Sequence, residues 1–66
     1  MNWQPIPSNA YALLSDCGHW SVCKVWSETG YLYQAWRTAK HPEGRALLAA
    51  RLPDAETAKA RCEGDK

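Results

Sequence analysis

The stretch SDCGHWSVC, residues 15–23, contains the side chains of this chain that are best suited to chemistry. Together with a later cysteine it supplies a Cys3His set, which is a legitimate zinc ligand set. Its members are Cys17, His19, Cys23 and Cys62. Structural zinc sites typically pair two cysteines a few residues apart on a tight knuckle, and no C-x-x-C occurs here. The spacing therefore favours turn and core cysteines over a metal site, and we predict no cofactor.

A nucleophile with its base is the second chemistry that this stretch could support. Cys17 and His19 lie two residues apart beside a tight turn, with Asp16 next to them. A cysteine becomes a nucleophile when an oriented imidazole takes its proton. A chain of 66 residues offers little concave volume for a substrate, and nothing else in it indicates a cleft. We therefore predict a protein without enzymatic activity and without a small-molecule substrate.

The composition limits the remaining classes of function. Sixty-six residues make one domain at most. In so short a chain, the free energy gained by burying apolar surface nearly equals the conformational entropy cost of folding. Four tryptophans and three tyrosines compensate, because large aromatic side chains bury the most surface per residue. An odd number of cysteines fits reduced thiols. No apolar run approaches a membrane span, and the first residues lack the pattern of a signal peptide, so we predict a cytoplasmic protein without membrane contact.

The charge is nearly balanced but unevenly placed. The net charge of +1 predicts no strong attraction to nucleic acid or anionic lipid. Residues 31–53 nevertheless hold a surplus of cations over the single acidic side chain of Glu43, whereas each flank is slightly acidic. The cations of this middle segment are Arg37, Lys40, Arg45 and Arg51. A solvated surface explains so modest a surplus.

The elements that position these residues begin with residues 1–10, which we predict to be an extended arm without a regular element. Proline removes a backbone donor and fixes extended angles, so Pro5 and Pro7 argue against a regular element there. Residues 11–14 form a short candidate strand, followed by turn chemistry at residues 15–18.

A β-hairpin follows. HWSVCKVW (19–26) is rich in aromatic and β-branched residues and is bounded by turns, and YLYQAWRT (31–38) is its returning strand. The register of the two strands decides which side chains share a face. A bulged loop of residues 28–30 places Trp20, Val22, Trp26, Leu32 and Trp36 together. A four-residue loop instead groups Trp20, Val22 and Trp26 with Tyr31, Tyr33 and Ala35.

The last third of the chain predicts one further strand and a helix. RALLAARL (45–52) has helix-forming residues, but its apolar alternation favours an edge strand. Asp54 is a suitable N-cap for the helix, and Leu52 a hydrophobic staple against its first turns. We predict a narrow apolar stripe along this helix, an ion pair between side chains four residues apart, and a glycine that ends the helix. These features are Ala55, Ala58 and Cys62 for the stripe, Lys59 with Glu63 for the pair, and Gly64 for the end.

The predicted fold is therefore α+β, a small antiparallel sheet of three to four strands with one C-terminal helix packed on one face. Residues 11–63 form the single domain, and residues 64–66 are a tail. Both faces of the sheet hold apolar side chains, and one short helix covers only one of them.

The order of three antiparallel strands and a helix that opens LPDAETAKA resembles AP2-type and integrase arm-type DNA-binding domains over residues 20–63. This resemblance implies contacts between the sheet face and DNA, which carry over to Lys24 and Arg37. The chain also resembles small proteins of unassigned role found in phages and prophages.

We predict a non-catalytic binding module, an accessory protein of phage or prophage type, that acts through an aromatic sheet face. A protein partner or a homodimer is favoured because exposed aromatic patches mark partner sites. Nucleic-acid binding by the sheet face is the alternative, since aromatic rings stack on bases. The candidate surface consists of Trp20, Lys24, Trp26, Tyr33, Trp36 and Arg37.

Overall fold

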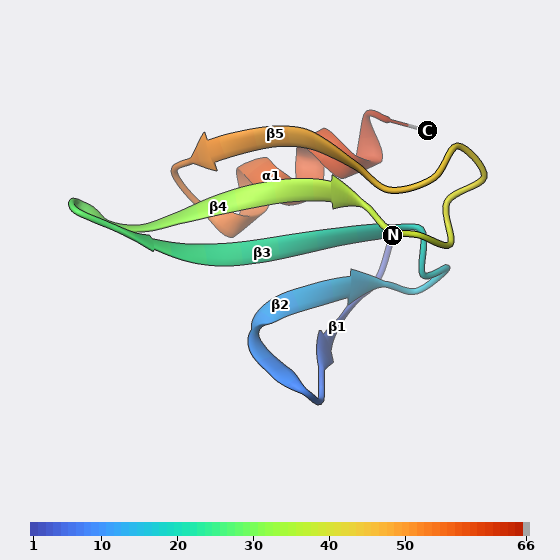
Figure 1. Ribbon diagram of the computed structural model, residues 1–66, viewed down its shortest axis with the longest axis horizontal. Helices are drawn as coiled ribbons and strands as arrows, with labels where there is room; N and C mark the ends of the chain where they lie inside the picture. The colour runs from blue at the N-terminus through green and yellow to red at the C-terminus, as the bar shows by residue number, and fades with distance from the viewer. Residues whose placement is uncertain (66) are drawn as a thin grey trace.

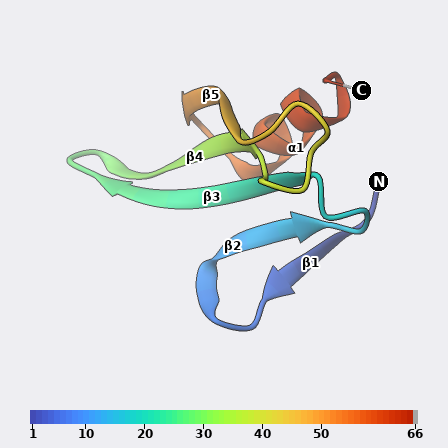
Figure 2. The same cartoon turned by 45° about the vertical axis from the view of Figure 1, so that its right-hand side comes forward.

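The computed structural model describes residues 1–65 as five antiparallel strands in sequence order, followed by one helix (Figure 1). The elements are β1 (Trp3–Ile6), β2 (Asn9–Ser15), β3 (Trp20–Ser27), β4 (Gly30–Arg37), β5 (Ala46–Leu52) and α1 (Ala55–Glu63). The α+β class is confirmed, but the sheet has five strands rather than three to four. Figure 2 shows β1 beside β2 at the end of the sheet that is remote from β5.

The additional strand is β1, in the segment whose prolines argued against a regular element. It pairs with β2, with Trp3 opposite Ser15 and Gln4 opposite Leu14, and the register shifts between Pro5 and Ile6. An edge strand tolerates proline, since the missing amide donor can face away from the sheet. The prediction that this extended segment contains no regular element was therefore wrong.

The β3–β4 hairpin adopts the register of the second alternative. Three directly opposed pairs define it: Trp26 with Tyr31, Val22 with Ala35, and Trp20 with Arg37. The closing pair is Ser27 with Gly30, so the loop is shorter than either alternative, and Gly30 has a φ of 115° that favours glycine. Because side chains alternate along a strand, Trp36 lies on the opposite face from Trp20, and the grouping of these two was wrong.

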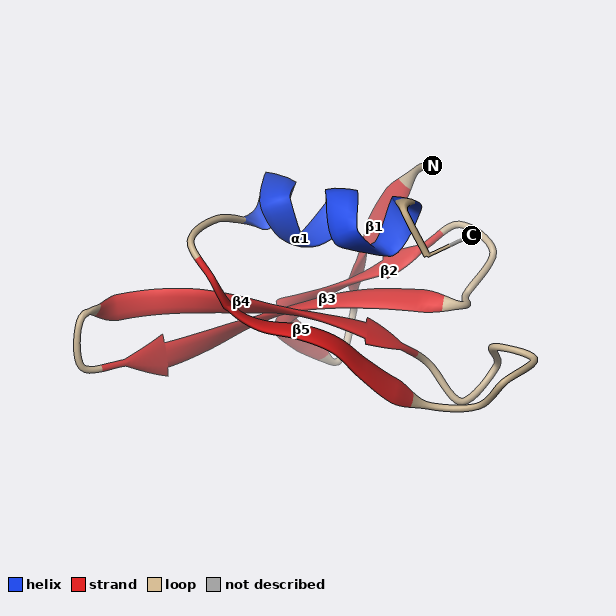
Figure 3. Cartoon of the chain, turned by 90° about the horizontal axis from the view of Figure 1, so that it is seen from above, coloured by secondary structure: helices blue, strands red, loops and turns tan. Residues whose placement is uncertain are grey.

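Helix α1 lies on one face of the sheet over β3, β4 and β5, and within residues 1–65 no helix covers the opposite face (Figure 3). The helix begins at the expected cap, where an Asp54 carboxylate oxygen accepts from the Thr57 N–H at 2.7 Å. The expected stripe faces the sheet, since Ala58 and Cys62 have no exposed surface. The buried core of the molecule consists of Trp20, Val22, Ala35, Ala58 and Cys62.

Two details of the helix differ from the sequence pattern. Lys59 pairs with Glu56 at 3.3 Å, three residues earlier, and not with Glu63. This order places the carboxylate in the first turn, near the positive end of the helix dipole. The helix does end before Gly64, but the φ of −74° at this residue is an ordinary helical value and does not require glycine.

The β5 segment is a strand, as the apolar alternation favoured, but its pairing with β4 is irregular. The register shifts twice along the pair, and Arg51 has a φ of 56°. Leu48 and Leu52 still pack against the core, whereas Ala50 is exposed. Both edges of the sheet are therefore interrupted, which hinders pairing with a further strand.

Replacing Ala58 by leucine is expected to lower the free energy of unfolding by about 1–3 kcal/mol, because the larger side chain has no room against the sheet. Ala60→Leu is the matched control at an exposed position of the same helix and should change it by less than about 0.5 kcal/mol. Urea unfolding followed by tryptophan fluorescence measures both variants. Equal effects at the two positions would contradict this packing.

Candidate binding surfaces

The side chains of the zinc hypothesis lie in different parts of the molecule. Cys17 is exposed in a turn, Cys23 is half-buried on β3, and Cys62 is buried on the side of α1 that faces the sheet. Burial raises the pKa of the Cys62 thiol to about 11, so this group stays protonated at neutral pH. Within residues 1–65, no three His, Cys, Asp or Glu side chains are arranged as a metal site requires.

The thiol of Cys17 and the imidazole of His19 make separate contacts. The Cys17 sulfur lies 3.5 Å from the Ser15 hydroxyl, and this hydrogen bond lowers the pKa of the thiol. The His19 ring packs edge-on against Trp20 and His41, with centroid distances of 5.7 and 5.6 Å. Ser15 also accepts from the Trp20 N–H at 3.0 Å. The polar groups of this stretch thus serve the turn that leads into β3.

Three residues form what we call the C-terminal clamp: Trp20, Arg37 and Asp65. One carboxylate oxygen of Asp65 accepts from Trp20 Nε1 at 2.9 Å and from Arg37 Nε at 2.8 Å, and the other accepts from Arg37 Nη2 at 2.8 Å. The Arg37 hydrogen bonds, and then that of Trp20, lower the pKa of Asp65 to about 2. Part of the predicted tail is thus fixed to the sheet, and Lys66 lies outside the described residues.

The clamp removes two residues from the predicted binding surface. Trp20 is only 6% exposed and belongs to the core. Arg37 also contacts Glu43 at 3.2 Å, so its guanidinium is shared between two carboxylates. Both side chains hold the end of the helix against β3 and β4. The sequence pattern did not indicate that Asp65 contacts these two side chains, because Asp65 is remote from both residues in the chain.

Four residues form an exposed cluster, the aromatic ladder: Tyr11, Lys24, Trp26 and Tyr31. Tyr31 is at its centre, with Tyr11 stacked at 6.2 Å, Trp26 edge-on at 5.0 Å, and the Lys24 Nζ 4.3 Å from the Tyr31 ring centroid. Trp26 is 70% exposed. By register the ladder lies on the same face as α1: Lys24, Trp26 and Tyr31 are on the part of the β3–β4 hairpin that extends beyond the helix, and Tyr11 is beside them on β2 (Figure 3).

An apolar hollow of about 220 Å³ adjoins the ladder. It shares Tyr11 and Lys24 with the ladder and reaches the first residue of the helix, Ala55. Tyr33, which belongs to the predicted surface, lies opposite Lys24 and lines this hollow. The structure therefore places three predicted residues together, namely Lys24, Trp26 and Tyr33. The predicted surface omitted Tyr11 and Tyr31, although the second register alternative grouped Tyr31 with Trp26; β-sheet pairing brings both tyrosines to this cluster.

The sixth predicted residue, Trp36, lies on the open face of the sheet. The Arg45 guanidinium carbon is 4.9 Å from the centroid of its ring, and its Nε1 donates to Gln34 Oε1 at 3.0 Å. A hollow of about 310 Å³ adjoins this pair and is also lined by Ser21 and Cys23. The open face thus presents one indole with a cation stacked on it.

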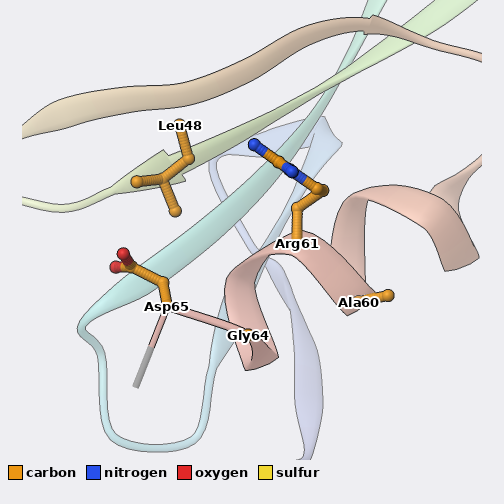
Figure 4. A pocket seen from close by; sticks show the side chains of 5 residues that line it. All are labelled: Leu48, Ala60, Arg61, Gly64 and Asp65. Atoms are coloured by element: carbon orange, nitrogen blue, oxygen red, sulfur yellow. The ribbon is translucent and has the colours of Figure 1, made fainter.

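A third hollow, of about 280 Å³, lies between the last turn of α1 and β5 (Figure 4). Leu48 points toward it from β5, and Asp65 and Arg61 line it from the helix side. The Asp65 carboxylate is already occupied by Trp20 and Arg37. This hollow is the outer side of the clamp, and its main polar group is not free to bind a ligand.

Comparison with protein-family models, curated proteins and solved structures finds no match for this chain. The described part of the chain contains no helix with the length and apolar character needed to cross a membrane.

Asp65→Asn is expected to lower the free energy of unfolding by about 1–3 kcal/mol at pH 7, because a neutral amide cannot accept both Arg37 hydrogen bonds. The pKa of Asp65 in the folded protein, about 2, lies below its ordinary value of 3.8. On acidification the unfolded state therefore binds this proton first, and stability is lost as the pH falls from about 4 to about 2. In Asp65→Asn, the free energy of unfolding should depend less on pH between about 4 and about 2.

Urea unfolding across this pH range measures the effect, and Glu63→Gln is the control, because Glu63 is exposed on the same helix. The control should leave the acid profile close to that of the wild type. A parallel loss of stability in the wild type and in Asp65→Asn would contradict the role of the clamp.

Proposed function

We propose that this chain is a non-catalytic binding module that holds a protein partner on the aromatic ladder. The supporting observation is Trp26, which is 70% exposed while its ring is fixed edge-on against Tyr31 at 5.0 Å. Tryptophan and tyrosine dominate the binding energy of protein interfaces. Rings that are already ordered lose little conformational entropy on binding, which favours affinity.

The rest of the molecule is consistent with binding through a sheet face. Both sheet edges are irregular, so a partner gains little by adding a strand to either one. Cys17 belongs to the turn before β3, and Cys62 belongs to the core. A setting in a phage or prophage, which the sequence resemblance suggested, remains a prediction.

The open face supports a second candidate function, nucleic-acid binding. The Trp36 ring with Arg45 stacked at 4.9 Å combines an aromatic platform with a cation, as single-strand binding sites do. The resemblance to DNA-binding families assigned DNA contacts to Lys24 and Arg37, but these two residues are less suitable for binding nucleic acid than Trp36 and Arg45. Arg37 is bound to Asp65, and Lys24 lies on the opposite face from Trp36.

Trp26→Ala is expected to weaken binding of the protein partner by about 30-fold, as for a central aromatic residue of an interface. The immobilised wild type, Trp26→Ala and Leu47→Ala are each incubated with lysate, and the retained proteins are quantified by mass spectrometry. Leu47 is the matched control, an exposed apolar side chain on the opposite face. Retention of the same proteins by all three would contradict the proposal.

For the second candidate, labelled oligothymidylate should bind at low salt, and binding should weaken steeply as salt rises. Trp36→Ala should remove about 1–3 kcal/mol of stacking free energy, and Arg45→Ala should reduce the salt dependence. Fluorescence anisotropy measures binding, with Arg61→Ala as a control that removes an exposed arginine from the helix. Absence of binding at low salt would exclude this function.

A further inference from the structure

We infer that the aromatic ladder and the apolar hollow beside it bind an extended, proline-containing peptide that carries an acidic side chain. This inference depends on the proposed function and specifies the chemistry of its partner. Four observations support it: the exposed area of the ladder, the irregular sheet edges, the adjoining hollow, and the position of Lys24.

The exposed area of the ladder suits a peptide better than a second copy of the chain. The residues Tyr11, Trp26 and Tyr31 are 54%, 70% and 41% exposed. Full aromatic side chains present about 150–250 Å² each, so the ladder offers on the order of 300 Å². A stable dimer buries about 800 Å² on each partner. The other large exposed apolar side chains among the described residues, Val25 and Leu47, lie on the opposite face and cannot add to this contact.

The irregular sheet edges favour a peptide that binds without forming strand hydrogen bonds. β1 contains Pro5 and a register shift, and β5 contains two register shifts together with the positive φ of Arg51. A polyproline II segment has no internal hydrogen bonds and is already extended before it binds. Such segments dock onto grooves lined by aromatic rings. The ladder is a surface of this kind, and it lies on a sheet face.

The hollow gives the peptide a place for one buried residue. Its volume is about 220 Å³, and it lies between the N-terminal strands and the start of α1. Most of its lining is apolar: Pro5, Ala12, Leu13, Val22, Tyr33 and Ala55. Since it shares Tyr11 with the ladder, a peptide that crosses the rings can place a proline or an aliphatic side chain in it.

Lys24 indicates the charge of the ligand. Its ammonium lies over the Tyr31 ring, and it takes part in none of the ion pairs found in residues 1–65. An acidic side chain beside the rings would pair with it. A nucleic-acid strand needs several cations along its path. The ladder contains only this one, and Glu28 follows β3 directly, so the charge pattern favours a peptide.

The test uses the full chain and labelled synthetic peptides, with binding measured by fluorescence anisotropy. The peptides are an oligoproline with one central glutamate, its glutamine counterpart, and a glycine–serine peptide of equal length with the same glutamate. The glutamate oligoproline should bind about 1.5- to fivefold more tightly than the glutamine peptide, and Lys24→Gln should abolish this difference. Trp26→Ala should weaken binding about 30-fold, and Leu47→Ala should leave it unchanged.

The inference is overturned if the oligoproline does not bind at millimolar concentration, or if the glycine–serine peptide binds equally well. It is also overturned if oligothymidylate displaces the peptide from Trp26, which would make the ladder a nucleic-acid site. These failures differ from failure of the proposed function. If Trp26→Ala still abolishes capture of a protein partner, the binding module remains and only the peptide chemistry is wrong.

Discussion

The length of the helix relative to the strands determines the surface of this molecule. A nine-residue helix is about 13 Å long, whereas an eight-residue strand is about 26 Å long. Helix α1 can therefore cover only about half of the β3–β4 hairpin. The cap at Asp54 fixes its beginning, and Asp65 fixes its far end beside Trp20. The covered half contains Trp20 and Val22, and the uncovered half contains Trp26.

The apolar surface of the helix is too small to determine this position by burial alone. Its two fully buried side chains are Ala58 and Cys62, which allow a close approach but bury little surface. The clamp adds directional hydrogen bonds between charged groups, which depend strongly on geometry. Arg37 and Trp20 hold Asp65 at one end of the hairpin, so the helix cannot move along the strands toward the loop. The same interaction that stabilises the helix thus keeps the aromatic ladder uncovered.

The parts of the fold that local patterns encode could be predicted from the sequence. The strands around Val22 and Ala35, and a helix capped by Asp54, each have signals within a few neighbouring residues. β1 was missed because proline removes a donor, although an edge strand does not need that donor. The candidate site was only partly predictable for a different reason. Whether an aromatic residue is exposed depends on distant partners: Asp65 buries Trp20 from the other end of the chain, and β-sheet pairing brings Tyr11 to Tyr31.

The four tryptophans show that residue type alone does not assign a function. Trp3 and Trp20 pack in or against the core, Trp36 lies on the open face, and Trp26 lies beyond the end of the helix. Trp20 and Trp26 are on the same face of the same strand, so their difference comes from what covers each end of that strand: the helix and Asp65 lie at Trp20, and neither reaches Trp26. A longer helix would bury Trp26 and add stability, but it would remove the exposed rings. A short helix therefore forgoes stability that this chain could gain, which fits the binding role proposed for the aromatic ladder.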